Sequence, residues 1–313
     1  MKTFLLEVLI CPACLPDEIR LEEKIVAFRK DDILEGGLHC AGCKRVYPIR
    51  NGVACLDPNA CSNNGHSGNK YETAPVVSAY LWSHYADILN EENASDAYRR
   101  WADLMRPHSG IAVDAGAAVG RFTFEMGQKS DFAIGLDNSQ AFIETARELM
   151  TGRCMKVALK QEGCLTRDVN LTLPPAWKTE TVEFIVADAL ALPFRANRVA
   201  SLSSLNLIDK VPLPLLHLAE MNRVTTDIGA QFLLSDPFSW SEEAAREEDW
   251  LGGKLSGPYA GKGLDNVRAL LSGDDHKLPP KWKLETHGHV WWKIRTHANH
   301  FEEIRSCYIK VRR

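Results

Sequence analysis

The most constraining feature of the sequence is a pair of C-x2-C motifs near its start, Cys11-Pro-Ala-Cys14 and Cys40-Ala-Gly-Cys43. Two such motifs, joined by a segment that is typical of a hairpin, bring four thiolates around one tetrahedral ion. Zinc suits these ligands because it binds sulfur tightly and needs no redox chemistry. Four protein ligands leave no open coordination position. The sequence therefore predicts a structural zinc site held by Cys11, Cys14, Cys40 and Cys43.

The other five of the nine cysteines are scattered along the chain. His39, Cys55 and Cys61 lie near the motifs, but we expect none of them to be a ligand because four cysteines already complete the site. Scattered cysteines beside a metal site favour a reducing compartment, so we expect a cytoplasmic protein. A signal peptide is not expected, because Glu7 interrupts the first apolar run and no small-residue cleavage site follows.

The charge distribution limits the classes of partner. The chain of 313 residues has 37 Lys and Arg against 41 Asp and Glu, a formal net charge of −4. There is no long basic run, so a broad nucleic-acid interface is not expected. No apolar stretch approaches the roughly 20 residues that span a bilayer, so we also expect no membrane segment.

A second motif is the stretch Ile111 to Phe122, in which a short apolar run ends at Asp114 and a small-residue turn follows. A strand, a tight turn and a helix starting at Arg121 present backbone N–H groups to an anionic or polar cofactor. We expect Gly116 and Gly120 to keep that approach open. Ala118 stands where a dinucleotide-binding fold usually has its second glycine, and a turn of this kind can also serve packing alone.

Strand and helix patterns alternate after this turn, which predicts an α/β protein with a mainly parallel, doubly wound sheet. A polar Gly/Asn/Ser stretch separates this region from the cysteine motifs and is typical of a linker. The expected division is a zinc-ribbon domain, a linker and a Rossmann-like domain, at residues 1–56, 57–75 and 76–313. Expected strands are residues 132–136, 182–187, 199–207, 230–235, 282–289 and 303–311, and expected helices are 76–89, 93–105, 141–150 and 263–271.

Three successive strands of this pattern end in an aspartate: Asp114, Asp137 and Asp188. Asp137 follows Asp114 at about the spacing at which a second-strand carboxylate meets ribose hydroxyls. Carboxylates suit a cofactor that carries a positive sulfur, a zwitterionic amino acid and an adenosine better than they suit two phosphates. The pattern therefore favours S-adenosylmethionine, with Asp188 and the small Ala189 beside the adenine. Singly, each aspartate could be only a turn former.

The stretch Val113 to Met126 resembles class I S-adenosylmethionine-dependent methyltransferases, and its wording is closest to the ovothiol-biosynthesis branch, which methylates a mercaptohistidine imidazole nitrogen. Further matching pieces are Tyr80-Leu-x-x-His-Tyr85, Gly135 to Ser139, Asp188 to Pro193, Asn206-Leu-Ile-Asp-Lys210, Ser235-Asp-Pro-Phe-Ser-Trp240 and Trp250 to Gly253. The resemblance implies a cofactor site formed by Asp114, Gly116, Ala118, Gly120, Asp137, Asn138, Asp188, Ala189 and Asn206.

The residues around the cysteine motifs carry a different resemblance. Phe4 to Cys14 and Leu38 to Val53 look like the small zinc-ribbon protein that activates tRNA, rRNA and release-factor methyltransferases. In that family the ribbon is a separate subunit that docks through exposed apolar surface, whereas here it is fused. We therefore expect the ribbon to pack on its own methyltransferase domain or to mediate a dimer or partner contact.

Some positions depart from the methyltransferase pattern. Lys210 stands where arginine is expected, and residues 160–181 look like an insertion without a motif. An acidic run at 241–249 is typical of a solvated helix face, and five glycines between 252 and 263 predict a mobile loop. Candidates for proton transfer are Asp209, His84 and Tyr85. Candidates for the substrate side are Tyr80, Lys210, Trp240, Trp292 and Arg295.

Together these features predict S-adenosylmethionine-dependent methyl transfer to a nitrogen, or a sulfur, of a small molecule such as an imidazole or amine. Two alternatives stay open. The first is an RNA or protein methyltransferase that uses the ribbon to dock on its partner. The second is a non-catalytic scaffold that binds the cofactor, for which Ala118 is the only support.

Overall fold

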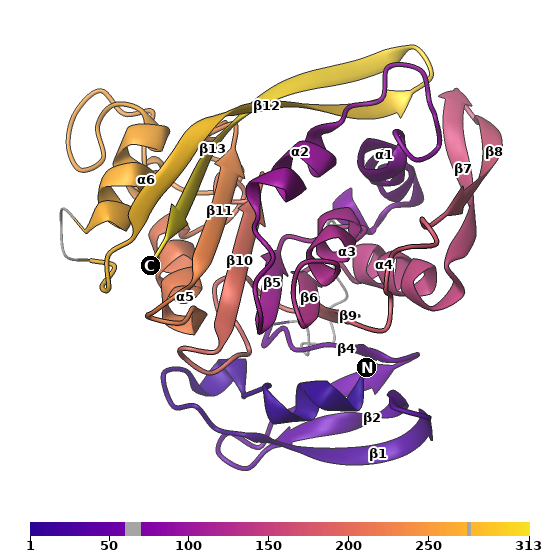
Figure 1. Cartoon of the computed structure of the whole chain (residues 1–313), viewed down its shortest axis with the longest axis horizontal. Coiled ribbons are helices and arrows are strands. Elements are labelled where there is room, and N and C mark those ends of the chain that lie inside the picture. Colours follow the sequence, from indigo (N-terminus) through magenta and orange to yellow (C-terminus); the bar gives the residue numbers. More distant parts are fainter. Residues whose placement is uncertain (60–69, 274–276) are drawn as a thin grey trace.

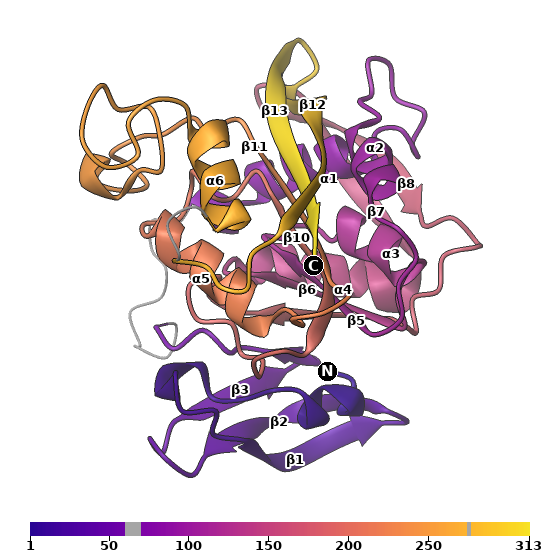
Figure 2. The ribbon, with the colours of Figure 1, turned by 60° about the vertical axis from the view of Figure 1, so that its left-hand side comes forward.

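The computed structural model describes residues 1–59, 70–273 and 277–313. Cys61 and His66 of the expected linker lie outside these ranges. The chain forms a small antiparallel sheet at its N-terminal end and a large mixed sheet covered by helices, and a two-stranded hairpin flanks the large sheet (Figures 1 and 2). None of the described helices is both long and apolar enough to cross a membrane.

The N-terminal sheet has four antiparallel strands in the order β1-β2-β3-β4. Two short 3-10 helices precede it, η1 (Thr3–Glu7) and η2 (Pro12–Cys14). The strands are β1 (Leu21–Arg29), β2 (Asp32–Cys40), β3 (Val46–Arg50) and β4 (Val53–Ala54). Cys11 precedes η2 and Cys40 ends β2, so the two cysteine motifs lie at neighbouring turns of one small fold.

The large sheet has seven strands in the order β12-β13-β11-β10-β5-β6-β9. Five of them are parallel, and β13 is antiparallel to both β11 and β12. The prediction of a doubly wound, methyltransferase-like α/β sheet is confirmed. The strands are β5 (Ile111–Ala115), β6 (Phe132–Asp137), β9 (Val182–Val186), β10 (Val199–Leu205), β11 (Gln231–Asp236), β12 (Lys283–His297) and β13 (His300–Arg312).

Helices cover both faces of this sheet (Figure 2). One core contains apolar residues of α1 (Ala74–Tyr85), α2 (Ala97–Leu104), α3 (Arg121–Gly127) and α4 (Gln140–Gly152). The other core contains residues of α5 (Pro214–Val224) and α6 (Gly263–Ser272), and it continues into the N-terminal ribbon. Ser139 caps α4, as its sequence predicts, because its hydroxyl accepts a hydrogen bond from Phe142 N.

Two local expectations are wrong, and one segment has more structure than was expected. Residues 160–181, which look like an insertion, include part of a hairpin of β7 (Cys154–Glu162) with β8 (Leu165–Thr172). Its buried apolar residues lie at alternate positions, as in Val157 and Leu159, which is the pattern of a strand. The acidic run contains only a short 3-10 helix, η4 (Glu247–Asp249). The last two strands are much longer than expected, because they pair with each other beyond the sheet and pass over α1 and α2 (Figure 1).

The ribbon packs against the large sheet of its own chain. Cys55 forms a parallel bridge with Val186, and Leu56 N donates to Val186 O, so the ribbon extends the edge of the sheet at β9. A buried Arg147 on α4 joins Asp32 of β2 to Glu183 of β9. Figure 1 shows the ribbon on the opposite side of the sheet from α1 and α2. Of the two alternatives for the ribbon, the structure shows packing on the same chain.

Candidate cofactor site and metal centre

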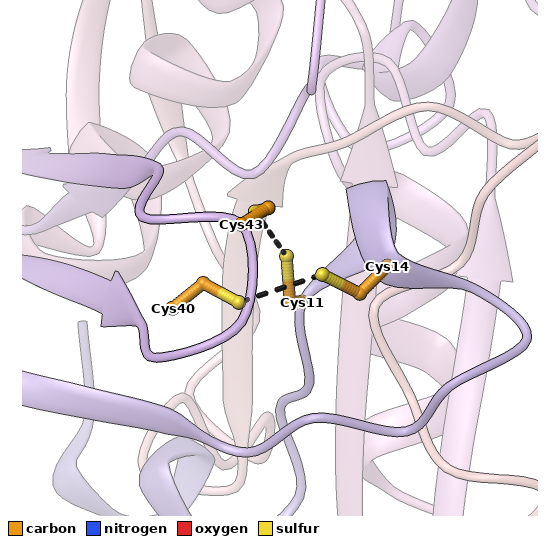
Figure 3. Close-up of side chains that lie close together, drawn as sticks. All are labelled: Cys11, Cys14, Cys40 and Cys43. Carbon is orange, nitrogen blue, oxygen red and sulfur yellow. Dashed lines mark hydrogen bonds between the residues drawn. The ribbon is translucent and has the colours of Figure 1, made fainter.

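The four cysteines predicted to bind zinc converge on one point (Figure 3). Their Sγ atoms all lie within 4.8 Å of one another, and the pairs Cys11–Cys43 and Cys14–Cys40 are 3.6 Å apart. Tetrahedral zinc with Zn–S bonds of about 2.3 Å requires sulfurs about 3.8 Å apart. The thiols therefore fit such an ion, and among the described residues they form the one cluster of three or more potential ligands.

Neighbouring residues shape this metal centre. The Tyr47 hydroxyl lies 3.2 Å from Cys11 Sγ, where it can donate to a thiolate. A Cβ on Gly42 would lie 2.4 Å from Ile19 Cδ1, so glycine is needed there for close packing of the two turns. His297 and His300 lie close together near the C-terminal end of the sequence. Their rings are stacked with centroids 5.7 Å apart, and they do not belong to the cysteine cluster.

The glycine turn joins β5 to α3 at the carboxyl edge of the large sheet. Gly116, Ala118 and Gly120 all have positive φ, at +76°, +45° and +87°. A Cβ on Gly116 would lie 3.0 Å from Leu207 Cδ2, and one on Gly120 would lie 2.6 Å from Phe184 Cζ. Glycine is thus required at both positions by backbone conformation and internal packing.

Asp137 faces this turn from the end of β6. Its Oδ2 accepts from Ala118 N at 3.0 Å and its Oδ1 accepts from Ser139 N at 2.9 Å. Burial raises the pKa of Asp137 to about 6. Two hydrogen bonds leave lone pairs on both oxygens, so the carboxylate is held in place and can still accept from a hydroxyl. Asn138, next in the chain, is exposed.

Asp114 at the end of β5 is nearly fully buried. It accepts hydrogen bonds from Thr123 Oγ1 and Ser203 Oγ, each at 2.8 Å, and burial raises its pKa to about 6. In the part of the chain that the structure describes, no Lys, Arg or His nitrogen lies within 4.0 Å of Asp114 or Asp137. These two carboxylates therefore give the turn a negative field that no nearby cation offsets.

The remaining predicted cofactor residues lie on the flanking strands of the same edge. Asp188 follows β9, accepts from Leu190 N and has its pKa raised by burial and by the charges of Asp57 and Glu220. The carbonyl of Ala189 lies 3.2 Å from His217 Nδ1. Asn206 follows β10 at φ +55° and accepts from Ser306 Oγ. Asp57 is thus a residue of the expected linker that lies beside the predicted adenine end.

Helix α1 covers the turn and carries three of the candidate residues. The Tyr85 hydroxyl donates to Val119 O at 2.8 Å from a fully buried position. His84 Nε2 lies 2.6 Å from the Tyr98 hydroxyl, and burial together with the charge of Arg121 lowers the His84 pKa well below 6.5. The geometry thus gives Tyr85 a structural bond to the turn.

Tyr80 is close to the turn and is influenced by Asp209, which is the third candidate for proton transfer. Burial raises the Tyr80 pKa, and the nearby carboxylates of Asp137 and Asp209 raise it further. The Tyr80 ring lies 4.7 Å from that of Phe142 and 6.4 Å from that of Trp292, centroid to centroid. Tyr80 of α1 thus lies beside Phe142 of α4 and Trp292 of β12, within electrostatic range of the Asp137 and Asp209 carboxylates.

Asp236 is a residue of this edge that sequence reasoning missed. It ends β11 and is fully buried, like the Asp209 side chain. Burial and the charge of Asp209 raise the pKa of Asp236 well above 3.8. The signal was present, because Asp236 ends a strand in the same way as the three predicted aspartates.

The other substrate-side candidates are placed differently. Lys210 Nζ lies 3.2 Å from Asp209 Oδ2, but its side chain is 42% exposed. Trp240 contacts Phe238 in the turn after β11. Arg295 lies near Glu91 and Arg167, which form an ion pair with each other between the α1–α2 connection and β8. The structure brings Tyr80 and Trp292 together within electrostatic range of Asp209, and leaves Arg295 with a different group of charges.

Residues 2–52 match the Trm112p-like protein family. No curated protein matches the sequence. One similar solved structure comes from work on the conversion of a disulfide bond into a thioacetal group during echinomycin biosynthesis. It is 18% identical to this chain, with a TM-score of 0.45. The match covers 70% of this chain and 81% of that chain. A S-adenosylmethionine-dependent methyltransferase from Methanosarcina mazei is 16% identical, with a TM-score of 0.42, over 67% and 94%.

A third structure is the complex between the Haloferax volcanii Trm112 methyltransferase activator and a provisionally named methyltransferase, 15% identical with a TM-score of 0.42 over 68% of this chain and 79% of that chain. Identities and TM-scores this low carry no argument about substrate or mechanism. Residues 2–52 form a Trm112-like domain with a cysteine cluster suited to zinc, and the sheet that follows is methyltransferase-like.

Proposed function

We propose that this chain is an S-adenosylmethionine-dependent methyltransferase whose acceptor is a nitrogen, or a sulfur, of a small molecule such as an imidazole or amine. The observation that carries the proposal is the Asp137 carboxylate held against the glycine turn at the carboxyl edge of a doubly wound sheet, with Asp114 and Asp188 at the ends of the two neighbouring strands. Ligands of such sheets bind at this edge. Asp114 and Asp137, which have no cationic side chain within 4.0 Å among the described residues, suit a ligand that itself carries positive charge.

The residues present fit the cofactor in the following proposed arrangement. Asp114, Gly116, Ala118 and Gly120 would hold the methionine end, and Asp137 with Asn138 would hold the ribose. Asp188 and Ala189 would lie against the adenine, and Asn206 would lie over the cofactor. The support is the buried charge of Asp114 and the fixed Asp137 carboxylate, which keeps lone pairs for hydroxyl donors. When bound, the cofactor supplies an electrophilic methyl group on a positive sulfur.

The chain's own residues would position the acceptor and exclude water. Helix α1 is anchored over the turn by the bond from Tyr85 to Val119 and by the ion pair of Arg121 with Asp87. The rings of Tyr80 and Trp292 add an apolar wall on that side. Methyl transfer depends mainly on such positioning in a dry site. Asp209 is the proposed acceptor of a proton from the methylated group.

The proposed division of the chain is a zinc-ribbon domain at 1–56, a linker at 57–75 and the methyltransferase domain at 76–313, with zinc as a structural ion. Apolar ribbon residues such as Leu5 and Leu9 are buried in a core shared with the large sheet. This contact disfavours the alternative in which that ribbon face docks on an RNA or protein partner.

The test is a binding titration followed by a transfer assay on the full chain. S-adenosylhomocysteine should bind with a dissociation constant in the micromolar range, and labelled methyl should pass from S-adenosylmethionine to a member of a panel of mercaptohistidine, histidine, primary amines and small thiols. Transfer to tRNA alone would support the RNA alternative. Binding without any transfer would support the scaffold. Failure to bind either form of the cofactor would contradict the proposal.

A further inference from the structure

Two buried carboxylates adjoin each other beside the proposed cofactor site. Asp209 follows β10 and Asp236 ends β11, and these strands are parallel neighbours with Leu205 opposite Ser235. Asp236 Oδ1 accepts from Phe238 N at 2.6 Å, and Asp209 Oδ2 accepts from Ser239 N at 2.8 Å. Because the two carboxylates bind consecutive backbone N–H groups of one turn, they lie side by side.

Each of these carboxylates has one oxygen without a donor. Asp209 Oδ1 and Asp236 Oδ2 are buried and have no hydrogen-bond partner among the described residues, and both side chains are 0% exposed. A buried carboxylate oxygen left without a donor destabilises the fold, because the hydrogen bonds that it made to water are not replaced. Native proteins rarely leave such groups unpaired unless a ligand, ion or water completes them. The pair therefore points to a ligand that brings hydrogen-bond donors.

The charge of the pair limits the ligand further. Burial and the charge of Asp209 raise the pKa of Asp236 well above 3.8, so the pair retains a proton at a pH where two isolated aspartates would both be ionised. Among the described residues, the pair forms one ion pair, between Lys210 and Asp209. The Lys210 side chain is 42% exposed, so water screens its charge. A buried site with about one negative charge suits a neutral nitrogen that becomes positively charged as it accepts the methyl group.

The sheet order places this pair on a definite side of the cofactor site. Across the edge the strands run β11, β10, β5, β6 and β9. Asp188 and Ala189, the proposed adenine contacts, follow β9 at the far end, and Asp137 follows β6. Asp209 and Asp236 lie after β10 and β11, beyond the glycine turn of β5. Tyr80 is near both Asp137 and Asp209 and so spans this distance. The pair is thus on the side away from the adenine.

The turn that holds the pair is strained and tightly packed. Phe238 has φ +55°, a left-handed conformation that is unfavourable for a bulky residue. Its ring lies against the backbone of Gly263, where an added Cβ would come within 2.6 Å of Phe238 Cδ1. The conformation that directs both N–H groups at the carboxylates is therefore maintained by the surrounding loop.

We infer that Asp209 and Asp236 together form the binding site for the nitrogen of the methyl acceptor, and that this acceptor is an N–H compound, such as an imidazole or amine, rather than a thiol. The inference rests on the proposed function and narrows it. The nitrogen lone pair forms the new bond to the methyl carbon as the carbon–sulfur bond breaks, and its electron pair stays on sulfur. The methylated group is then cationic and gives an N–H proton to the Asp209 carboxylate: in an amine the proton comes from the methylated nitrogen, and in an imidazole it comes from the other ring nitrogen.

The inference is tested with the full chain and the variants Asp209→Asn, Asp236→Asn and Asp209→Glu, with the exposed Asp103→Asn as matched control. Histidine, histamine, mercaptohistidine and cysteine are the acceptor probes, and S-adenosylhomocysteine is the binding probe. Both Asn variants should bind S-adenosylhomocysteine within threefold of wild type. They should lose at least 100-fold in kcat/KM for the nitrogen acceptor, Asp236→Asn mainly through KM. Asp209→Glu should have a higher kcat than Asp209→Asn, and the acidic limb of its pH–kcat profile should be shifted from that of wild type. Asp103→Asn should match wild type.

Three results would overturn the inference. One is transfer to cysteine or another thiol in preference to every nitrogen probe. The second is Asn variants that transfer methyl groups within threefold of wild type. The third is Asn variants with reduced thermal stability and intact kinetics, which would make the pair structural. If wild type binds no S-adenosylhomocysteine, the proposed function fails as well, and that titration distinguishes the two failures.

Discussion

The ribbon and the sheet edge satisfy their polar groups in opposite ways. In the ribbon, four thiols from two short motifs converge closely enough to fill the coordination shell of one ion. At the sheet edge, carboxylates from five strand ends lie near one another, and two of their oxygens have no donor among the described residues. A site with a structural role is complete in itself, whereas a site that receives a ligand keeps unpaired groups.

Removing a ribbon ligand should give the largest effect. Cys40→Ser breaks the tetrahedral thiolate set, and metal binding contributes on the order of 10 kcal/mol to small zinc modules. We expect loss of the bound metal, measured by elemental analysis, and a fall in the thermal midpoint of at least about 10 °C. The exposed Cys154→Ser is the control. Full metal content in Cys40→Ser would contradict the zinc assignment.

The contact between the two regions should be the next most sensitive. Arg147→Met leaves Glu183, whose side chain is 0% exposed, with the Met1 ammonium at 3.9 Å as its remaining cation, and breaking a buried ion pair costs about 3–5 kcal/mol. Urea unfolding should report this loss, and adding Glu183→Gln should recover part of it. Arg99→Met removes an exposed pair with Asp96 and should cost at most about 1 kcal/mol. Equal effects of Arg147→Met and Arg99→Met would mean that the ribbon contact contributes little.

At the sheet edge, Asp137→Asn should weaken cofactor binding without unfolding the chain. Loss of a charged acceptor for ribose hydroxyls costs about 1.5–3 kcal/mol, or roughly 10- to 100-fold in affinity. Isothermal titration with S-adenosylhomocysteine measures the change, and Asp103→Asn again serves as control. An unchanged affinity would mean that Asp137 does not bind the ribose.

The smallest expected effect is a pH dependence of cofactor binding at the sheet edge. Burial raises the pKa of Asp137 to about 6, so lowering the pH from 7.5 to 5 protonates most of this carboxylate. Affinity for S-adenosylhomocysteine should fall about tenfold over this range, because binding requires the ionised fraction. Asp137→Asn should flatten the profile.

The sign of the stability effect separates this loss from unfolding. A carboxyl group whose pKa is raised in the folded state holds its proton more tightly there. Asp137 therefore stabilises the fold as pH falls through 6 toward its unfolded value near 4. A loss of affinity that follows a loss of secondary structure over the same range would contradict this explanation.

The metal centre and the type of fold could be predicted from the sequence because both depend on local patterns. Two C-x2-C motifs need only short-range turns to converge, and alternating strand and helix patterns with a glycine turn favour a doubly wound sheet. The aspartates at strand ends were likewise visible in order along the chain. Their roles toward a cofactor stay predictions.

Tertiary structure decided which of the long-range candidates meet. Asp209 and Asp236 are 27 residues apart in the printed sequence, and only the parallel pairing of β10 with β11 and a strained turn at Phe238 bring them together. Tyr85 is bonded to the turn and Arg295 lies with a separate ion pair, although the sequence offers no sign of either. Burial then set the charge of each carboxylate, because desolvation depends on everything packed around a group and not on its neighbours in the chain.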